Sequence, residues 1–379
     1  MQGKIAMSAD VIVIGGGLVG AAIAYGLAAR NVRVLVLDGD DRDFRATNAN
    51  GGLVWRQGKG LDMPAYQQLT CASADQWPSF CAELEEATGL DLQLEKNGGL
   101  WFCLGEAEFE QRQGQMLRLD NQLSNVNRDW EMLERSAVEK LLPKARLGPD
   151  VVGASFGRRD GHVNPLRLLT ALQTALIQRG GRVLGGHTVH AVRADGRGGF
   201  TVDCGSEQLS AARIVIAAGL GSKVLGAQVG LDIPIRPQRG QMMITERLEP
   251  FLPLPLHGVS QTQQGTVSIG TTNEEVGFDT STTGDAITGL SAMVIRWLPA
   301  LRDVKLVRQW AGLRILTPDG YPIYAESQSH PGAFVATCHS GVTLAAAHAG
   351  LLADAITAGR LPADLDSFHQ RRFDVPKAA

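Results

Sequence analysis

The sequence is constrained most by the glycine pattern Gly15-Gly16-Gly17-Leu18-Val19-Gly20. A short β-branched run, residues 11–14, precedes it, and an alanine-rich stretch, residues 18–30, follows it. In a G-x-G-x-x-G turn the first glycine permits a tight turn, the second lets the backbone approach a pyrophosphate, and the third lets the helix pack closely on the strand. Free N–H groups at the start of the helix favour an anion. We therefore expect an N-terminal βαβ unit that binds a dinucleotide.

A second apolar run, residues 32–37, ends at Asp38. A carboxylate at this position can accept hydrogen bonds from ribose hydroxyls, and it argues against the 2′-phosphate of NADP. A glycine-rich turn without a ligand is the alternative. However, strand, turn, helix, second strand and acid all fit within about thirty residues, the size of one βαβ unit. The fingerprint alone does not separate NAD from FAD.

The composition is that of an ordinary globular protein. With 379 residues, two domains are expected, and the formal net charge of −3 without a basic block gives no support for a nucleic-acid partner. Residues 11–29 approach the length of a membrane span, but they contain five glycines and directly follow Asp10, which disfavours a span or a signal segment. The five cysteines are widely spaced and form no CxxC, so no metal site is expected. We expect reduced thiols in a cytoplasmic protein, with peripheral attachment to the inner membrane left open.

The pattern of apolar residues predicts the other elements. Helices are expected at residues 65–87, 106–125, 166–179, 286–298 and 343–358, the third begun by Asn164 and Pro165. Strands are expected at residues 200–204, 213–218 and 332–337, a pair of strands at 181–192, and antiparallel strands across 232–271. Nucleotide-type features thus alternate with antiparallel segments. The expected fold class is α/β, with a Rossmann-like domain (1–78, 151–225 and 313–379) interleaved with an antiparallel-sheet substrate domain (79–150 and 226–312).

Six further motifs follow the fingerprint in a specific order and spacing. They are ATNANGGLVW (46–55), DGHVNPLRLLTAL (160–172), IVIAAGLGS (214–222), RGQM (239–242), WAGLRILTPDGYP (310–322) and CHSGVTLA (338–345). With them the chain resembles the D-amino-acid-oxidase family of FAD-dependent amine oxidoreductases over about residues 10–356. The resemblance implies the fold of that family and FAD as the cofactor.

Several of these segments have a physical reason to contact FAD. Gly219 follows a strand and permits close backbone approach, and the resemblance places the backbone of Val189 at the adenine. N–H groups at residues 341–343 could stabilise negative charge on the flavin N1–C2=O edge, although a plain helix cap at Ser340 or Thr343 is an alternative. The expected cofactor-binding residues are Gly15, Gly17, Leu18, Val19, Asp38, Arg45, Ala46, Thr47, Asn50, Gly51, Gly52, Leu53, Val189, Ala218, Gly219, Gly312, Ser340, Gly341, Val342 and Thr343.

Arg314 is the expected substrate-binding and catalytic arginine. The resemblance assigns the arginine of the W-x-G-x-R segment to the substrate carboxylate, for which a guanidinium offers two parallel donors. A surface or salt-bridged arginine is the alternative interpretation. Ile315-Leu316 replaces the Pro-containing continuation that is common in the family, which leaves the local backbone geometry open.

Three aromatic side chains complete the expected site. His339, as a catalytic residue, and His257, as a substrate-binding residue, could shape the pocket or help to deprotonate an ammonium group. Trp55 could bind substrate by covering the flavin or lining the pocket. Each of the three has a structural role as its alternative.

The implied reaction is oxidation of a C–N bond, in which hydride passes from the Cα of a neutral amine to flavin N5 and leaves an imine. GLVWRQGKG (52–60) and TCHSGVTLAAAHAG (337–350) are similar to a bacterial subgroup of hydroxyproline dehydrogenases, opine oxidase catalytic subunits and hydrogen cyanide synthase subunits. A D-proline or cis-4-hydroxy-D-proline dehydrogenase is the first expectation. The FAD subunit of an opine-oxidising or cyanide-forming complex and an oxygen-using glycine or sarcosine oxidase are the alternatives. The electron acceptor would be a quinone or a partner redox subunit, in a homo- or hetero-oligomer.

Overall fold

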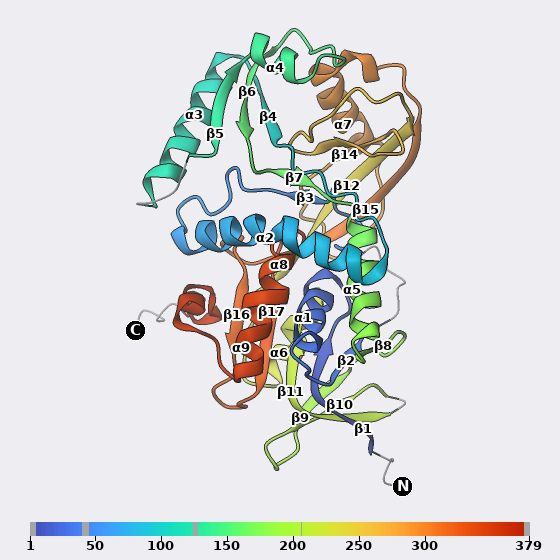
Figure 1. Cartoon of the computed structure of the whole chain (residues 1–379), viewed down its shortest axis with the longest axis vertical. Coiled ribbons are helices and arrows are strands. Elements are labelled where there is room, and N and C mark those ends of the chain that lie inside the picture. The colour runs from blue at the N-terminus through green and yellow to red at the C-terminus, as the bar shows by residue number, and fades with distance from the viewer. Residues whose placement is uncertain (1–4, 40–44, 124–127, 206, 375–379) are drawn as a thin grey trace.

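The chain folds into two stacked halves in the computed structural model, which describes residues 5–39, 45–123, 128–205 and 207–374 (Figure 1). The lower half contains a mixed sheet with the order β16-β17-β11-β1-β2-β8. Neighbours from β17 to β8 are parallel, and β16 is an antiparallel edge strand. The strands are β1 (Ile5–Ile14), β2 (Val34–Leu37), β8 (Arg182–Leu184), β11 (Gln208–Ile216), β16 (Ile323–Glu326) and β17 (Ala333–Thr337).

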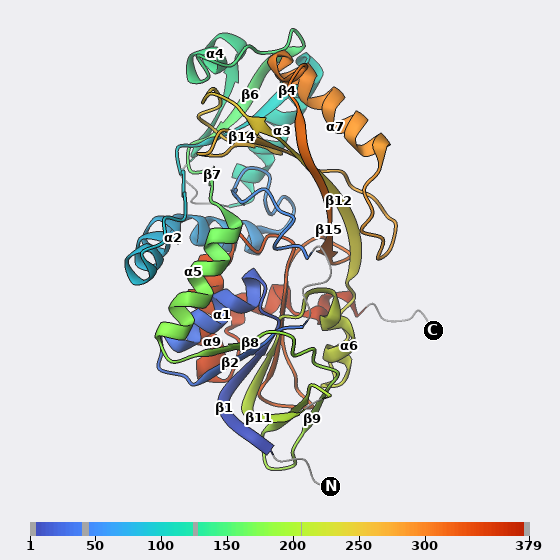
Figure 2. The ribbon, with the colours of Figure 1, turned by 90° about the vertical axis from the view of Figure 1, so that its right-hand side faces the viewer.

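Helices cover both faces of this sheet. Figure 2 shows α1 (Leu18–Ala28), α5 (Pro165–Gln178) and α9 (Ala353–Ala358) on one face and α6 (Ser222–Ala227) on the other. The strand centres are fully apolar because both faces are covered, as in residues 11–14 and 34–37. A Cβ added to Gly20 of α1 would lie 1.9 Å from the Gly15 carbonyl oxygen. The third fingerprint glycine is therefore needed for close helix–strand packing, as the sequence predicts.

The upper half is antiparallel. A four-stranded sheet has the order β13-β14-β12-β15, and a three-stranded sheet has the order β4-β6-β5. Their strands are β4 (Gly99–Leu104), β5 (Trp130–Glu134), β6 (Val151–Gly157), β12 (Arg236–Arg247), β13 (Val259–Gln261), β14 (Thr266–Gly270) and β15 (Leu306–Leu316). The helices α3 (Glu106–Asn121), α4 (Arg135–Leu141) and α7 (Gly284–Trp297) surround them. The long helix α2 (Pro64–Thr88) and the ribbon of β3 (Leu53–Val54) and β7 (Gly161–His162) lie between the halves (Figure 1).

This architecture confirms the predicted fold class, and two predicted elements differ from it. Residues 181–192 do not form a strand pair: β8 pairs with β2, whereas β9 (Ala191–Ala194) pairs with β10 (Phe200–Asp203). The chain between β8 and β9 crosses the edge of the sheet, where the His187 N–H donates to the Asp38 carbonyl (2.7 Å). The predicted helix 106–125 ends at Asn121, and residues 124–127 lie outside the described residues.

The predicted helix 343–358 begins later, with α8 (Ala345–Ala347), and contains a π-helical turn (His348–Leu352) before α9. The π turn frees backbone carbonyls from the regular helical pattern, and the Arg30 guanidinium donates to those of Ala349 (3.0 Å) and Gly350 (3.1 Å). Gly26 permits the contact, because a Cβ there would lie 2.0 Å from the Ala349 oxygen.

The expected domain division stays a prediction. Strand pairing places β6 wholly with β4 and β5, and β15 wholly with β12, so the expected boundaries at residues 151 and 313 fall at or within strands of the upper sheets. All five cysteines are free thiols. Among the described residues, no helix is long and apolar enough to cross a membrane.

Candidate active site

A cavity of about 1370 Å³ lies where the two halves meet, and it contains every residue that the sequence predicted for cofactor and substrate. Its lining runs from the ends of β1 and β2, past the 45–55 loop and residues 338–343, to the inner surfaces of β12 and β15. Segments more than 300 residues apart in the sequence thus meet around one space. Their individual roles remain predictions, but the structure brings them together.

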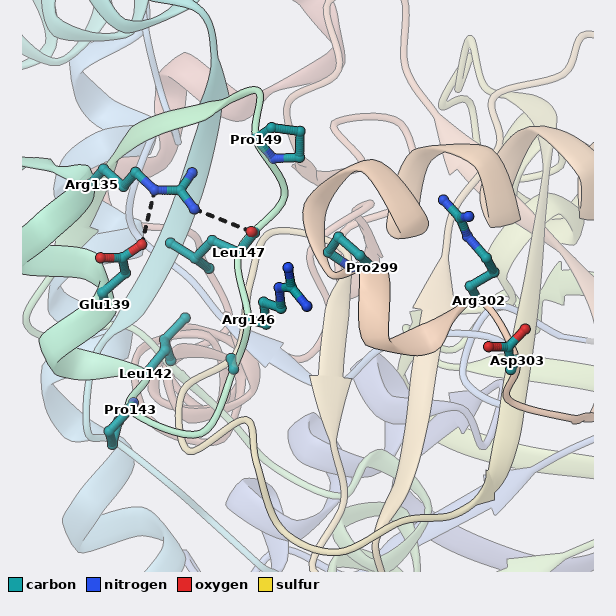
Figure 3. Close-up of a pocket in the computed structure, with 11 residues that line it drawn as sticks. Arg135, Glu139, Leu142, Pro143, Arg146, Leu147, Pro149, Pro299, Arg302 and Asp303 are labelled. Atoms are coloured by element: carbon teal, nitrogen blue, oxygen red, sulfur yellow. Dashed lines mark hydrogen bonds and ion pairs between the residues drawn. The ribbon is translucent and has the colours of Figure 1, made fainter.

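A second hollow of about 850 Å³ lies between α4 and the 3₁₀ turn at Pro299–Leu301 (Figure 3). Its Arg135 is bonded to Glu139 (2.9 Å) and to nearby backbone carbonyls, including that of Leu147 (3.2 Å). None of the predicted site residues lines it. The larger cavity is therefore the candidate active site.

The fingerprint glycines form one end of the cavity. Gly15 has φ +108°, and a Cβ there would lie 2.3 Å from the Ala217 oxygen, so the turn requires glycine. A Cβ on Gly17 would meet only the Thr47 hydroxyl, at 3.1 Å, so the backbone at this position lies open toward the cavity. The first turn of α1 begins directly at this opening, where its N–H groups and dipole favour an anion.

Asp38 and the 45–52 loop surround this end. The Asp38 carboxylate accepts from the Gly16 N–H (3.1 Å) and from Arg45 (2.7 Å), which fixes its position at the end of β2. The Thr47 hydroxyl accepts from the Leu18 N–H (3.2 Å) and so ties the loop to the fingerprint. Asp38 is also the sole carboxylate among the described residues that line the cavity.

Arg314 projects from β15 at the opposite end. Its Nη1 donates to the Thr272 carbonyl (2.9 Å), and its Nη2 donates to the Thr271 hydroxyl. A Cβ on Gly240 of β12 would lie 2.7 Å from Nη1, so glycine there lets the guanidinium lie across the strand. Burial lowers the pKa of Arg314, and no described carboxylate forms a salt bridge with it. β15 continues regularly through Leu316, which pairs with Arg236, so the missing proline does not disturb the backbone.

The segment that holds Arg314 is anchored by a second arginine. Arg239 is buried on β12 and binds Glu274 (2.6 Å) and Asp279, which follow the two threonines. The neighbouring Gln241 also donates to Glu274 (2.9 Å). The RGQM motif therefore fixes the loop on which the Arg314 partners lie.

His257 and His339 both line the cavity. Both residues are exposed. Burial lowers the pKa of His339 to about 3 and that of His257 to about 4, and the nearby positive charge of Lys59 contributes to both shifts. Such weak bases are poor proton acceptors near neutral pH. The geometry favours the alternative that they shape the pocket.

Aromatic rings support His257 from behind. Trp101 stacks on it with ring centroids 3.6 Å apart, and the buried guanidinium of Arg112 lies 4.1 Å from the Trp101 ring centre. Trp55 is 2% exposed, and its ring centroid lies 6.0 Å from that of His257. It is therefore a buried core residue that also lines the cavity.

Neither of the alternative helix caps is present at residues 340–343. The Thr343 hydroxyl donates to the Leu53 carbonyl (3.1 Å) and accepts from the Trp55 N–H (3.2 Å), which joins this segment to β3. The Ser340 hydroxyl instead accepts from Lys59 and Tyr66, each at 2.8 Å.

The sequence did not point to several cavity residues, including Lys59, Trp101, Gly240 and Met242. Lys59 lies in GLVWRQGKG, and Gly240 and Met242 lie in RGQM, so these three fall within motifs of the family resemblance. No spacing rule marks Trp101 or Gly240, because their roles depend on contacts across the sheets. Among the described residues, no group of three or more His, Cys, Asp or Glu side chains could hold a metal ion.

The fold and the cavity define a dinucleotide-binding protein of the α/β class, in which an antiparallel half lies against a Rossmann-like half. The family model of FAD dependent oxidoreductases named DAO matches residues 10–355, and the chain belongs to this family. The chain is 40% identical to the B subunit of opine oxidase from Agrobacterium tumefaciens, across 97% of this chain and 99% of that protein. It is 30% identical to the HcnC subunit of hydrogen cyanide synthase from Pseudomonas aeruginosa, across 83% and 84%. The crystal structure of glycine oxidase from Geobacillus kaustophilus superposes with a TM-score of 0.86 at 26% identity, across 96% and 98%.

The cofactor of this family is FAD, and the described residues fit it. Backbone lies open to the cavity at Gly17, Gly51 and Gly219, where an added Cβ would meet nothing closer than 3.1 Å, 3.9 Å and 3.7 Å. Asp38, Val189 and residues 340–343 line the same cavity as these glycines. When bound, FAD supplies the hydride acceptor, and the protein supplies orientation, charge and a dry site.

Proposed function

We propose that this protein oxidises the C–N bond of a small amino acid or carboxylated secondary amine. The observation that carries this proposal is Arg314, a cavity-facing guanidinium that is held by neutral oxygens rather than by a carboxylate. Such a group is available for a substrate carboxylate, with which it can form two parallel charge-assisted hydrogen bonds. Family membership supports the redox chemistry.

The residues of the cavity position the substrate rather than exchange protons with it. Arg314 would fix the carboxylate, and the wall of His257, Trp101 and Trp55 would limit the size of the carbon skeleton and exclude water. Burial lowers the pKa of both cavity histidines far below neutrality, so neither would accept a proton from the substrate ammonium. The amine would therefore have to lose its proton before the reaction and react as its neutral form. Loss of hydride from Cα then leaves an imine, which water hydrolyses or which remains cyclic.

Three substrate groups are proposed. D-proline and cis-4-hydroxy-D-proline are the first, since their compact rings suit a pocket bounded by stacked aromatic side chains. An opine is the second, and the 40% identity with the B subunit of opine oxidase over nearly the whole chain favours it equally. Glycine and sarcosine form a lesser third group, supported by the fold shared with glycine oxidase. A subunit role, with electrons passing to a quinone or a redox partner, is part of the opine proposal.

Anaerobic reduction of the purified yellow protein tests the proposal. Each of cis-4-hydroxy-D-proline, D-proline, an opine, glycine and sarcosine is added, and bleaching of the visible flavin absorbance is followed. Bleaching by the chain alone supports an independent dehydrogenase, and bleaching that requires a partner chain supports the subunit role. Absence of bleaching by every amine, with and without partner chains, would overturn the proposed reaction.

A further inference from the structure

Ser340 receives two hydrogen bonds at the point where it lines the cavity. The Lys59 ammonium and the Tyr66 hydroxyl each donate to the Ser340 Oγ at 2.8 Å. A hydroxyl has two acceptor lone pairs and one proton. With both lone pairs occupied, the Ser340 hydroxyl can act only as a donor in the remaining direction. Among the described residues, no hydrogen bond donated by this hydroxyl is found.

When it is protonated, Lys59 is a cation that the described part of the chain leaves without an opposite charge. It forms no salt bridge with a described carboxylate, and the hydrogen bond that holds it goes to the uncharged Ser340 hydroxyl. Burial lowers its pKa, an effect that Cys338 and Asp160 partly oppose. A buried charge without an opposite partner is costly, and an anion bound in the cavity beside Ser340 would offset this cost and favour the charged form of Lys59.

Lys59 lines the same cavity as His339 and His257. Its charged form lowers the pKa of both rings. The pKa of His339 also responds to Arg314, the proposed carboxylate partner. Both cationic side chains line this cavity, Arg314 from β15 and Lys59 from the 55–63 turn segment.

We propose that Lys59 is a positioning residue that, together with Tyr66, fixes the Ser340 hydroxyl as a donor to an anionic oxygen in the cavity. The oxygen belongs either to the reduced flavin, whose ring becomes negatively charged, or to the substrate carboxylate. In both cases the hydrogen bond from Lys59 to the Ser340 Oγ is the contact through which we expect Lys59 to act. The proposal rests on FAD binding as part of the proposed function, but not on the identity of the substrate.

The test uses the FAD-loaded protein and four variants: Lys59→Met, Ser340→Ala, the double variant and the control Lys96→Met. Lys96 is a suitable control because it is half-buried like Lys59, but it donates to backbone carbonyls, such as that of Ala74 (2.9 Å), and does not line the cavity. The first measurement is the equilibrium between flavin and a redox dye. The second is the affinity for pyrrole-2-carboxylate, a planar carboxylate that has no oxidisable C–N bond, followed by the flavin spectrum.

If the anion is the reduced flavin, Lys59→Met shifts the dye equilibrium about tenfold toward oxidised flavin, the effect of one lost charge-assisted hydrogen bond. If it is the substrate carboxylate, the affinity for pyrrole-2-carboxylate falls about tenfold and the dye equilibrium stays constant. In either case we expect Ser340→Ala to change the same measurement by a similar factor. The double variant should change it little further than either single variant, because both substitutions impair the same hydrogen bond from Ser340 to the anion. Additive losses would refute the action through Ser340. A Lys59→Met protein that matches Lys96→Met in both measurements would overturn the proposal.

These measurements remain informative if the proposed reaction is wrong. The dye equilibrium requires bound FAD but no amine substrate. If no amine reduces the protein but its dye equilibrium depends on Lys59, the proposed C–N oxidation is refuted. The positioning role of Lys59 is then still supported.

Discussion

Gly240→Ala should weaken carboxylate substrates while leaving the fold intact. Gly240 lies on β12, across from Gly312, and an added methyl group would lie 2.7–2.8 Å from three atoms of the Arg314 guanidinium. Ordinary contacts begin near 3.4 Å, so the guanidinium must retreat by several tenths of an ångström. The clash involves the far end of a flexible side chain, which can move without disturbing the strands.

The expected magnitude follows from the hydrogen bonds that the displacement breaks. A charge-assisted hydrogen bond contributes about 1.5–3 kcal/mol. Losing one of two bonds between Arg314 and a carboxylate should therefore lower kcat/KM about ten- to hundredfold, at about 1.4 kcal/mol for each factor of ten. An amine without a carboxylate makes neither bond and should be affected little.

The assay compares D-proline with pyrrolidine, or the best substrate from the bleaching screen with its decarboxylated amine. Gly289→Ala is the matched control, since Gly289 lies in α7 with no atom within 4 Å of an added Cβ. Equal losses for the amine with and without the carboxylate would show that Gly240 acts on the flavin or the fold. An unchanged kcat/KM for the carboxylate substrate would refute the displacement of Arg314.

Three further predictions concern FAD binding, acid stability and the substrate loop. Gly20→Ala should abolish FAD retention on purification, measured as flavin per protein, because the methyl group would lie 1.9 Å from the Gly15 oxygen; normal flavin content would contradict the close packing. Burial lowers the pKa of His348 to about 3, below its unfolded value of about 6.5, so its contribution to stability is present above pH 6.5 and is lost as pH falls toward 3. His348→Gln should reduce the loss of urea resistance between pH 7 and pH 5, and an unchanged loss would contradict this assignment. Arg239→Gln should raise KM for a carboxylate substrate several-fold, with a smaller effect on kcat, because the loop behind Arg314 loses two ion pairs; an unchanged KM would separate the loop from the site.

The sequence by itself determined the dinucleotide-binding turn of this protein. The spacing of Gly15, Gly17 and Gly20 between a β-branched strand and an alanine-rich helix leaves few structures other than a dinucleotide-binding turn. Asn164 and Pro165 also predicted a helix start, which the structure confirms with the Asn164 side chain accepting from two backbone N–H groups. These features are local, because each depends on the conformational preferences of residues that are close along the chain.

Only the tertiary structure decided how the substrate end is built. Arg314 was chosen by resemblance, but its position depends on Gly240 across the sheet and on the loop that Arg239 anchors. Lys59 and Ser340 are hundreds of residues apart, and no periodicity indicates that their side chains meet. The helix expected at 343–358 likewise contains a π turn whose freed carbonyls are satisfied by Arg30, from another part of the chain. Contacts of this kind depend on where the folded elements come together. The fingerprint glycines specify only the turn between β1 and α1, at the start of the chain.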